Sequence, residues 1–201
     1  LVANRPIDVA TAREIDKLFL EVLIAPDFEA EALTILEGKK NRILLRQKEA
    51  IDARWSYRSM LGGVLAQETD RAVETTAEMK PVTKVAPTAE ELTDLVFATK
   101  LVKHSKSNAI VLSKGGQLIA SGVGQTSRVD ALKQAIEKAR HFGFDLKGAV
   151  LASDAFFPFD DCVTLAAEAG ITAIAQPGGS VRDADSIAAA DRLGVAMVMT
   201  G

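Results

Sequence analysis

The stretch Ala149-Val-Leu-Ala-Ser-Asp-Ala-Phe-Phe-Pro-Phe-Asp-Asp161 decides how this chain folds. Its first four residues are apolar and predict a buried strand, and helical spacing of apolar residues begins at Val163. The turn between them holds three phenylalanines, a proline and three carboxylates. Open α/β folds bind ligands where strands end, so aromatic rings beside carboxylates at this place can hold a flat heterocycle. The alternative is a hydrophobic corner, with Phe157 and Phe159 buried in the core.

The residues around this stretch predict alternating helices and strands. Thr88 and Glu91 form a capping-box pattern at the start of a helix. Apolar runs on either side of Lys114-Gly115-Gly116 predict a hairpin, and Ser127 is placed to cap the helix that follows. This order predicts a mixed sheet in a layered α/β domain. The expected helices are 88–102, 129–139, 163–169 and 181–192, and the expected strands are 109–113, 117–121, 147–152, 171–175 and 195–199.

The first part of the chain is less regular. Residues 50–69 are harder to assign, because Trp55 and Tyr57 alternate with arginines and Gly62-Gly63 interrupts the run. Residues 71–87 are polar, contain two prolines and have no clear period, which makes them the best candidate boundary between two parts of the chain. The expected elements before them are a helix at 8–19, a strand at 22–24, a helix at 30–36 capped by Gly38, and a strand at 43–45.

Composition narrows the class of protein. With 201 residues, 48% of them hydrophobic and 25% charged, the chain can bury a core of its own. The formal charge of -3 and the scattered lysines and arginines give no nucleic-acid surface. A single cysteine, Cys162, excludes an intrachain disulfide and fits a cytoplasmic location. We expect no membrane span and no signal peptide. Since the chain opens on Leu1 rather than Met and closes at Gly201 after an apolar run, we expect a fragment of a longer protein.

Several segments, taken together, resemble one family. They are Ile24-Ala-Pro26, Glu31-Ala-Leu33, Gly62-Gly-Val-Leu65, Lys106-Ser-Asn-Ala109, Gly122-Val-Gly-Gln-Thr-Ser-Arg128, Ser153 to Phe159, and Pro177-Gly-Gly-Ser180. In this order they resemble the C-terminal half of the bifunctional purine biosynthesis protein. That family joins an inosine monophosphate (IMP) cyclohydrolase, a hydrolase, to a formyltransferase acting on 5-aminoimidazole-4-carboxamide ribonucleotide (AICAR). The resemblance covers essentially the whole chain.

The resemblance implies a fold and a reaction. The fold is a layered mixed sheet like that of cytidine deaminases but without zinc, with residues 1–75 ending a first such unit and 76–201 forming most of a second. The reaction transfers a formyl group from 10-formyltetrahydrofolate to AICAR in purine biosynthesis, in a homodimeric multifunctional enzyme. The cyclohydrolase domain and the family's catalytic Lys-His segment are not in this sequence, so we expect the chain alone to be inactive. The alternative is a non-catalytic ligand-binding or scaffold domain of the same fold. A deaminase is disfavoured because its zinc signature is absent.

The candidate site residues follow from chemistry and from the resemblance. Asn108 precedes a strand, and its amide either closes a turn or orients an amine and a formyl oxygen. The resemblance makes it catalytic, in contact with both substrates. It also implies AICAR contacts at Glu21 and Phe156. The implied folate contacts are Arg128, Val129, Pro158, Asp161, Ser180 and Val181. The candidate ligands of a potassium ion are Ser105, Ser107 and Asp154.

Other polar features carry weaker predictions. Ser127 and Arg128 open a helix whose free N–H groups favour anions, and Gly178-Gly179-Ser180 precedes another such helix start. The alternative for Arg128 is a solvated arginine. Neither His104 nor His141 is expected to be the general base. Cys162 lies at a helix start, where a thiol pKa can fall, but a structural thiol is the favoured interpretation.

Overall fold

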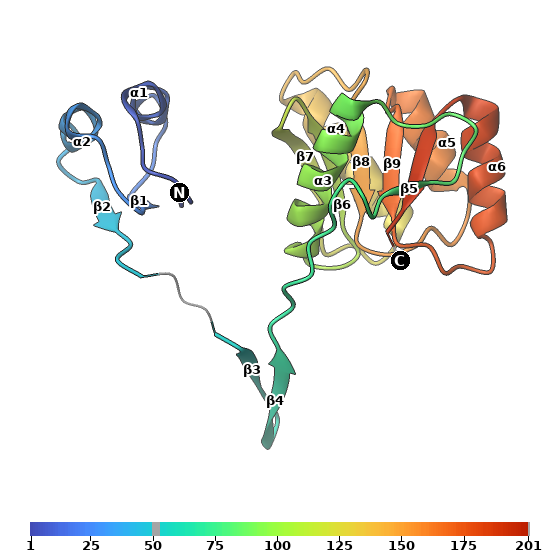
Figure 1. Ribbon diagram of the computed structural model, residues 1–201, viewed down its shortest axis with the longest axis horizontal. Helices are drawn as coiled ribbons and strands as arrows, with labels where there is room; N and C mark the ends of the chain where they lie inside the picture. The colour runs from blue at the N-terminus through green and yellow to red at the C-terminus, as the bar shows by residue number, and fades with distance from the viewer. Residues whose placement is uncertain (50–52, 201) are drawn as a thin grey trace. The chain divides into compact units, whose positions relative to one another are not determined.

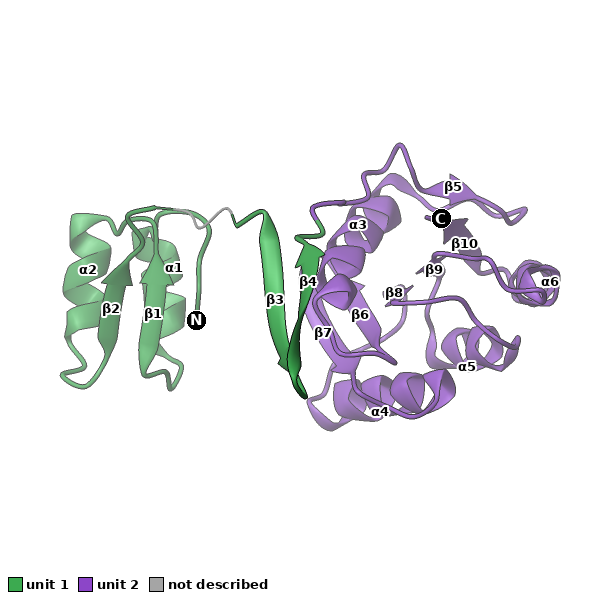
Figure 2. Cartoon of the chain, turned by 90° about the horizontal axis from the view of Figure 1, so that it is seen from below, with its two compact units in different colours: residues 1–70 green, residues 71–201 purple. Residues whose placement is uncertain are grey.

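The computed structural model describes residues 1–49 and 53–200, and it divides the chain into two compact units, Leu1–Asp70 and Arg71–Gly201 (Figure 2). The polar segment expected to mark a boundary begins at the same point, residue 71. Whether the two units correspond to two deaminase-like units, as the division at residues 75 and 76 implies, stays a prediction. Each unit is described by itself.

The second unit is built on a mixed β-sheet (Figure 1). Among the described residues, six strands pair in the order β5-β10-β9-β8-β6-β7. Strands β8, β9 and β10 are parallel, while β6 runs antiparallel to both β8 and β7, and β5 runs antiparallel to β10. This is the layered mixed α/β sheet that the sequence predicts. The strands are β5 (Lys80–Pro81), β6 (Ile110–Lys114), β7 (Gln117–Gly122), β8 (Val150–Ser153), β9 (Ala173–Gln176) and β10 (Ala196–Met199).

Helices cover both faces of this sheet (Figure 1). One face lies under α3, and the opposite face lies under α4, α5 and α6. The helices are α3 (Ala89–Lys103), α4 (Arg128–His141), α5 (Asp161–Ala169) and α6 (Asp183–Leu193). None of the helices in the described part of the chain is long and apolar enough to span a membrane.

The two faces of the sheet differ in side-chain size. Alternation along each strand sends neighbouring side chains to opposite faces. Large apolar side chains on the strands pack under α4, α5 and α6, whereas only alanines and valines from the same strands meet α3. The large set is Ile110, Leu112, Leu151, Ile174 and Met197, and the small set is Val111, Val150, Ala152, Ala173, Ala175, Ala196 and Val198. Burying each of the large side chains contributes about 1.5–3 kcal/mol to folding.

Local sequence signals set the starts of α3 and α4. The capping box is confirmed: Thr88 Oγ accepts from the Glu91 N–H at 3.2 Å, and Glu91 Oε2 accepts from the Thr88 N–H at 2.8 Å. Ser127 caps α4 as predicted, since its hydroxyl accepts from the Asp130 N–H at 3.2 Å. Gly38 does follow α2, but with a right-handed φ of -56° rather than a left-handed glycine cap. Helix α5 begins two residues earlier than the apolar spacing indicated, at Asp161.

The first unit contains a small α/β layer and a separate hairpin. Strands β1 (Val22–Ala25) and β2 (Ile43–Arg46) are parallel, and their apolar side chains pack with α1 (Val9–Asp16) and α2 (Ala30–Glu37). The hairpin pairs β3 (Trp55–Met60) with β4 (Gly63–Glu68), in the segment that was hard to assign from its pattern of residues. Every residue of β3 and β4 is exposed, so no burial pattern marks these strands. The start of that segment, at residues 50–52, lies outside the described residues.

Gly122 provides a stability test of the contact between β7 and α4. A Cβ at this position would lie 1.9 Å from the Ala131 carbonyl oxygen and 2.7 Å from its carbon, both backbone atoms. We expect Gly122→Ala to lower the free energy of unfolding by about 1–3 kcal/mol or more, because the backbone must shift. Denaturant unfolding measures the change, with Ser121→Ala at the neighbouring, half-buried position as the control. Equal stability of the two variants would contradict the close contact.

Candidate functional site

The topology brings four chain segments to one edge of the sheet in the second unit. Strands β7, β8 and β9 point the same way and β6 points the opposite way, so three carboxyl ends and one amino end meet there. A hollow of about 390 Å³ lies at this edge. It is lined by Asn108, Thr126, Ser127, Arg128, Ala155, Phe156 and Pro158. This is the edge at which open α/β sheets bind ligands.

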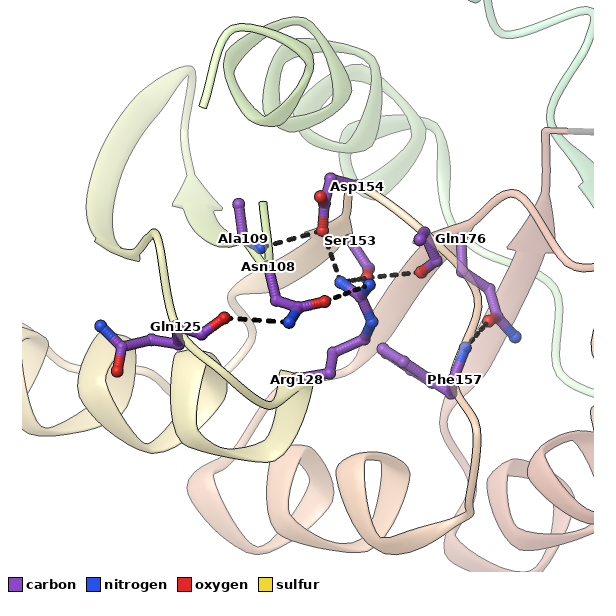
Figure 3. Close-up of polar contacts among 9 residues, drawn as sticks. Asn108, Ala109, Gln125, Arg128, Ser153, Asp154, Phe157 and Gln176 are labelled. Carbon is purple, nitrogen blue, oxygen red and sulfur yellow. Dashed lines mark hydrogen bonds and ion pairs between the residues drawn. The ribbon is translucent and has the colours of Figure 1, made fainter. Parts of the chain in front are cut away.

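The Arg128 side chain lies at the centre of a polar network beside the hollow (Figure 3). The residue is only 8% exposed, so it is not the solvated arginine of the alternative interpretation. Its Nη1 donates to Ser153 Oγ at 3.1 Å and forms an ion pair with the Asp154 carboxylate. Its Nη2 donates to Asn108 Oδ1 at 2.9 Å. The guanidinium therefore joins residues from three different segments.

The Asn108 amide is held at both ends (Figure 3). Its Oδ1 accepts from Arg128, and its Nδ2 donates to the Gln125 carbonyl oxygen at 2.9 Å. The backbones of Asn108 and Gln125 also exchange hydrogen bonds of 3.3 Å. A carboxamide oxygen can accept two hydrogen bonds and its nitrogen can donate two. One acceptor position and one donor hydrogen therefore remain for a ligand.

Asp154 is the counter-charge of the network. Its Oδ1 accepts from the Ala109 N–H at 2.9 Å as well as from Arg128. Burial raises the pKa of this carboxyl, but hydrogen bonds from Ser107, the Ala109 N–H and Arg128 together lower the pKa below its ordinary value. Asp154 is therefore ionised at neutral pH and pairs with a fully charged arginine.

The aromatic turn after β8 divides its three rings between core and surface. Phe157 is fully buried, and its N–H donates to Oε1 of the buried Gln176 at 2.7 Å. Phe159 is 51% exposed and lies 5.1 Å from the Arg182 guanidinium, so the hydrophobic-corner alternative holds for Phe157 and fails for Phe159. Phe156 is 42% exposed and lines the hollow together with Pro158. Anchoring Phe157 thus leaves the rings on either side available at the surface.

The glycine loop before α6 is already bound to an internal carboxylate. The Gly179 N–H donates to Asp183 Oδ2 at 2.7 Å, and the Arg182 N–H donates to Ser180 Oγ at 3.1 Å. These N–H groups were expected to be free for an anion. Since side chains of the loop and of α6 occupy them, the loop does not match the expected open anion site.

A family model described as the AICARFT/IMPCHase bienzyme matches residues 1–138 of the chain. The chain belongs to this family. The bifunctional purine biosynthesis protein PurH of Bacteroides thetaiotaomicron is 61% identical over 201 residues, which are 100% of this chain and 40% of that protein. PurH of a Thermoanaerobacter species is 54% identical over 198 residues, which are 98% of this chain and 38% of that protein. The chain thus spans about 40% of the length of the curated relatives it matches.

Some solved structures are also similar. A diaminohydroxyphosphoribosylaminopyrimidine deaminase/reductase from Thermotoga maritima gives a TM-score of 0.37 at 26% identity, covering 54% of this chain and 34% of that one. The dCMP deaminase of cyanophage S-TIM5 in its apo form gives 0.38 at 19% identity, covering 49% of this chain and 88% of that one. At these TM-scores the fold class rests on the strand order and layers of the sheet itself.

The structure brings some of the predicted site residues together and separates others. Asn108, Arg128, Phe156 and Pro158 line one hollow. The remaining predicted residues lie elsewhere. Val129 is half-buried and packs against the core, and Asp161 starts α5, where its carboxylate accepts from the Cys162 N–H. Ser180 and Val181 lie on the loop before α6. Glu21 belongs to the first unit and lines a hollow of about 720 Å³ there, together with Lys17, Lys39, Lys40 and Arg42.

Sequence reasoning missed two of the partners of Arg128, Ser153 and Asp154, and also missed Gln176, which accepts from the Phe157 N–H. Asp154 was considered only as a potassium ligand, and Ser153 and Gln176 were not considered as site residues. The one signal for them is position, because Ser153 and Gln176 are polar residues that end strands otherwise made of apolar side chains.

The structure leaves the predicted potassium site untested. Ser105 Oγ donates to the Leu101 carbonyl oxygen at 3.0 Å, and Asp154 Oδ1 is paired with the cationic Arg128. Within the described residues, no three His, Cys, Asp or Glu side chains gather as a metal site. A potassium ion held by hydroxyl and carbonyl oxygens stays a prediction.

Cys162 tests the interpretation of the thiol at the start of α5. Burial, and secondarily the neighbouring Asp161 charge, raises its pKa to about 12, so the lowered pKa considered for a helix start is wrong. At pH 8 only about one thiol in ten thousand is then ionised. We expect a disulfide reagent to label the folded chain at least about 100-fold more slowly than the unfolded chain. Cys162→Ser gives the background, and equally fast labelling of the folded chain would contradict a buried thiol.

Proposed function

We propose that the chain is part of the formyltransferase portion of an AICARFT/IMPCHase bienzyme. The reaction moves the formyl group of 10-formyltetrahydrofolate to the 5-amino group of AICAR. The observation that carries the proposal is the Asn108 amide, fixed at both ends beside a hollow that Phe156 and Pro158 also line. Membership in the family supports the same reaction.

The chemistry of formyl transfer requires what this amide offers. The amine of an aminoimidazole carboxamide is a poor nucleophile, so the two reacting groups must be held in line. The remaining N–H of Asn108 can donate to the formyl oxygen, where negative charge develops, and its remaining lone pair can accept from the attacking amine. Asn108 thus orients both partners and stabilises charge without exchanging a proton.

The other candidates take supporting roles in this proposal. Phe156 offers an aromatic face to the heterocycle of AICAR, and Glu21 is a second AICAR contact. Folate binds against Pro158 and Asp161. Arg128 and Val129 at the start of α4, and Ser180 and Val181 on the glycine loop, complete its contacts. A cytoplasmic homodimer is part of the same proposal.

The proton acceptor is proposed to lie outside this chain. His104 is exposed and caps the carboxyl end of α3, and His141 ends α4 with its ring 5.1 Å from the Phe142 ring. Neither position belongs to the segments around the hollow. The family's Lys-His pair is the proposed base.

The proposal predicts activity only in a longer context. We expect the chain alone to show no turnover, because general acid–base assistance is typically worth about 10² to 10⁴ in rate. Exchanging the matching stretch of the Bacteroides thetaiotaomicron relative for this chain should give a chimera that forms tetrahydrofolate from both substrates. Spectrophotometric assay measures this. A folded chimera that binds substrates without turnover would favour a scaffold domain.

Asn108→Ala in the chimera tests the orienting role. We expect kcat to fall on the order of 10²-fold with little change in either KM, because a misplacement of about 1 Å at the reacting centre costs that much. Steady-state kinetics with each substrate varied in turn measures the split. Lys138→Ala, on the exposed side of α4, is the control. An unchanged kcat would contradict the orienting role and would favour the alternative, in which Asn108 only closes a turn.

A further inference from the structure

We propose that Asp154 is a positioning residue that acts through Arg128 to fix the amide of Asn108 in one orientation. The orientation itself is a property of this chain, and its kinetic consequence rests on the proposed function. Asp154 lies after β8, Arg128 begins α4, and Asn108 precedes β6 (Figure 3). One guanidinium thus links three segments that are distant in sequence.

Asp154 and Ser153 hold the Arg128 guanidinium in place. An arginine side chain is long and flexible, and it presents a fixed donor only when other groups anchor it. Here Nη1 is anchored by the Asp154 carboxylate and by Ser153 Oγ at 3.1 Å, so Nη2 points at Asn108 Oδ1. The side chains of the ion pair are 8% and 13% exposed, so water competes little for either partner.

Arg128 in turn selects one of two orientations of the amide. Rotating a carboxamide by half a turn exchanges its oxygen and nitrogen. A guanidinium only donates, so the group that faces Arg128 must be Oδ1, and the group that faces the Gln125 carbonyl must be Nδ2. Without Asp154, the Arg128 guanidinium would lose the acceptor that anchors its Nη1 and would turn toward water. Asn108 would then lose one of the two contacts that exclude the rotated state, and only the Gln125 carbonyl would still hold the amide.

The geometry supplies a matched pair of variants. A single atom, Asp154 Oδ1, accepts from both the Ala109 N–H and Arg128. An asparagine at this position keeps that oxygen and loses the charge, whereas an alanine loses both. Asp154→Asn should therefore preserve the orientation of Asn108, and Asp154→Ala should lose it.

The hydrogen bond that holds this orientation is monitored in the 201-residue chain by nuclear magnetic resonance of the Asn108 side-chain NH₂ group, assigned by its loss in Asn108→Ala. We expect at least about 10-fold faster solvent exchange of the proton donated to the Gln125 carbonyl in Asp154→Ala, because local opening governs exchange, and little change in Asp154→Asn. Arg128→Lys keeps a charge beside Asp154 without the second donor, and it should behave like Asp154→Ala. Thermal unfolding confirms that each variant is folded. Unchanged exchange in folded Asp154→Ala and Arg128→Lys overturns the proposal.

Kinetics in the chimera separate a positioning role from other roles. We expect Asp154→Ala to lower kcat by on the order of 10²-fold at similar KM, and Asp154→Asn to stay within about 5-fold of the parent. In a double-mutant cycle, adding Asp154→Ala to Asn108→Ala should cost nothing further, because both changes disable one interaction. Additive losses of kcat in the double variant would overturn the proposal. A loss of kcat in Asp154→Asn as large as that in Asp154→Ala would also overturn it, because the effect would then come from the charge of Asp154. An inactive parent chimera would refute the proposed function, while the exchange measurement would still decide the role of Asp154.

Discussion

The arginine–carboxylate pair at the edge of the sheet organises everything around it. A guanidinium cannot lose its proton at neutral pH, so a buried arginine requires hydrogen-bond acceptors and a counter-charge nearby. Asp154 provides the charge, and Ser153 and Asn108 provide further acceptors. A buried ion pair of this kind contributes little net stability, since desolvation offsets the attraction. Its effect is on geometry, because the cost of breaking it holds three loops in one relative position.

The loops that follow strands β7, β8 and β9 satisfy several of their own backbone N–H groups. The glycine loop before α6 gives its N–H to Asp183, and the loop before α4 gives the Val123 N–H to Gln134 at 3.1 Å. Gln176 holds the aromatic turn by the Phe157 N–H. Each contact fixes a loop before any ligand arrives, so less conformational entropy is lost on binding. What is left for a ligand is concentrated at Asn108 and at the two half-exposed aromatic rings.

Much of the fold could be predicted from local patterns. The capping box at Thr88 and Glu91 and the cap at Ser127 involve residues three positions apart, so a short stretch of sequence contains both partners of each interaction. The hairpin of β3 and β4 was not predicted, because its strands are exposed on both faces and the alternation around Trp55 and Tyr57 is short and stops at Gly62-Gly63. The site was harder for a different reason. Arg128 meets Asp154 across 26 residues, and such a contact depends on strand order rather than on spacing. Phe157 is buried and Phe159 is half-exposed because the turn directs their side chains differently. The composition of the turn does not show this direction.

The small side chains beneath α3 determine where this molecule can change shape. Ala152, Ala173 and Ala175 have no side-chain rotamers, and α3 packs against the strands that carry them. Few side chains on that face of the sheet can change conformation, so the face offers little room for repacking beneath the strands that end at the hollow. Adjustment to a larger or differently shaped ligand is therefore expected in the turns that follow the strands. Adaptation to new ligands, by natural variation or by engineering, would proceed through insertions and exchanges in those turns and leave the face under α3 unchanged.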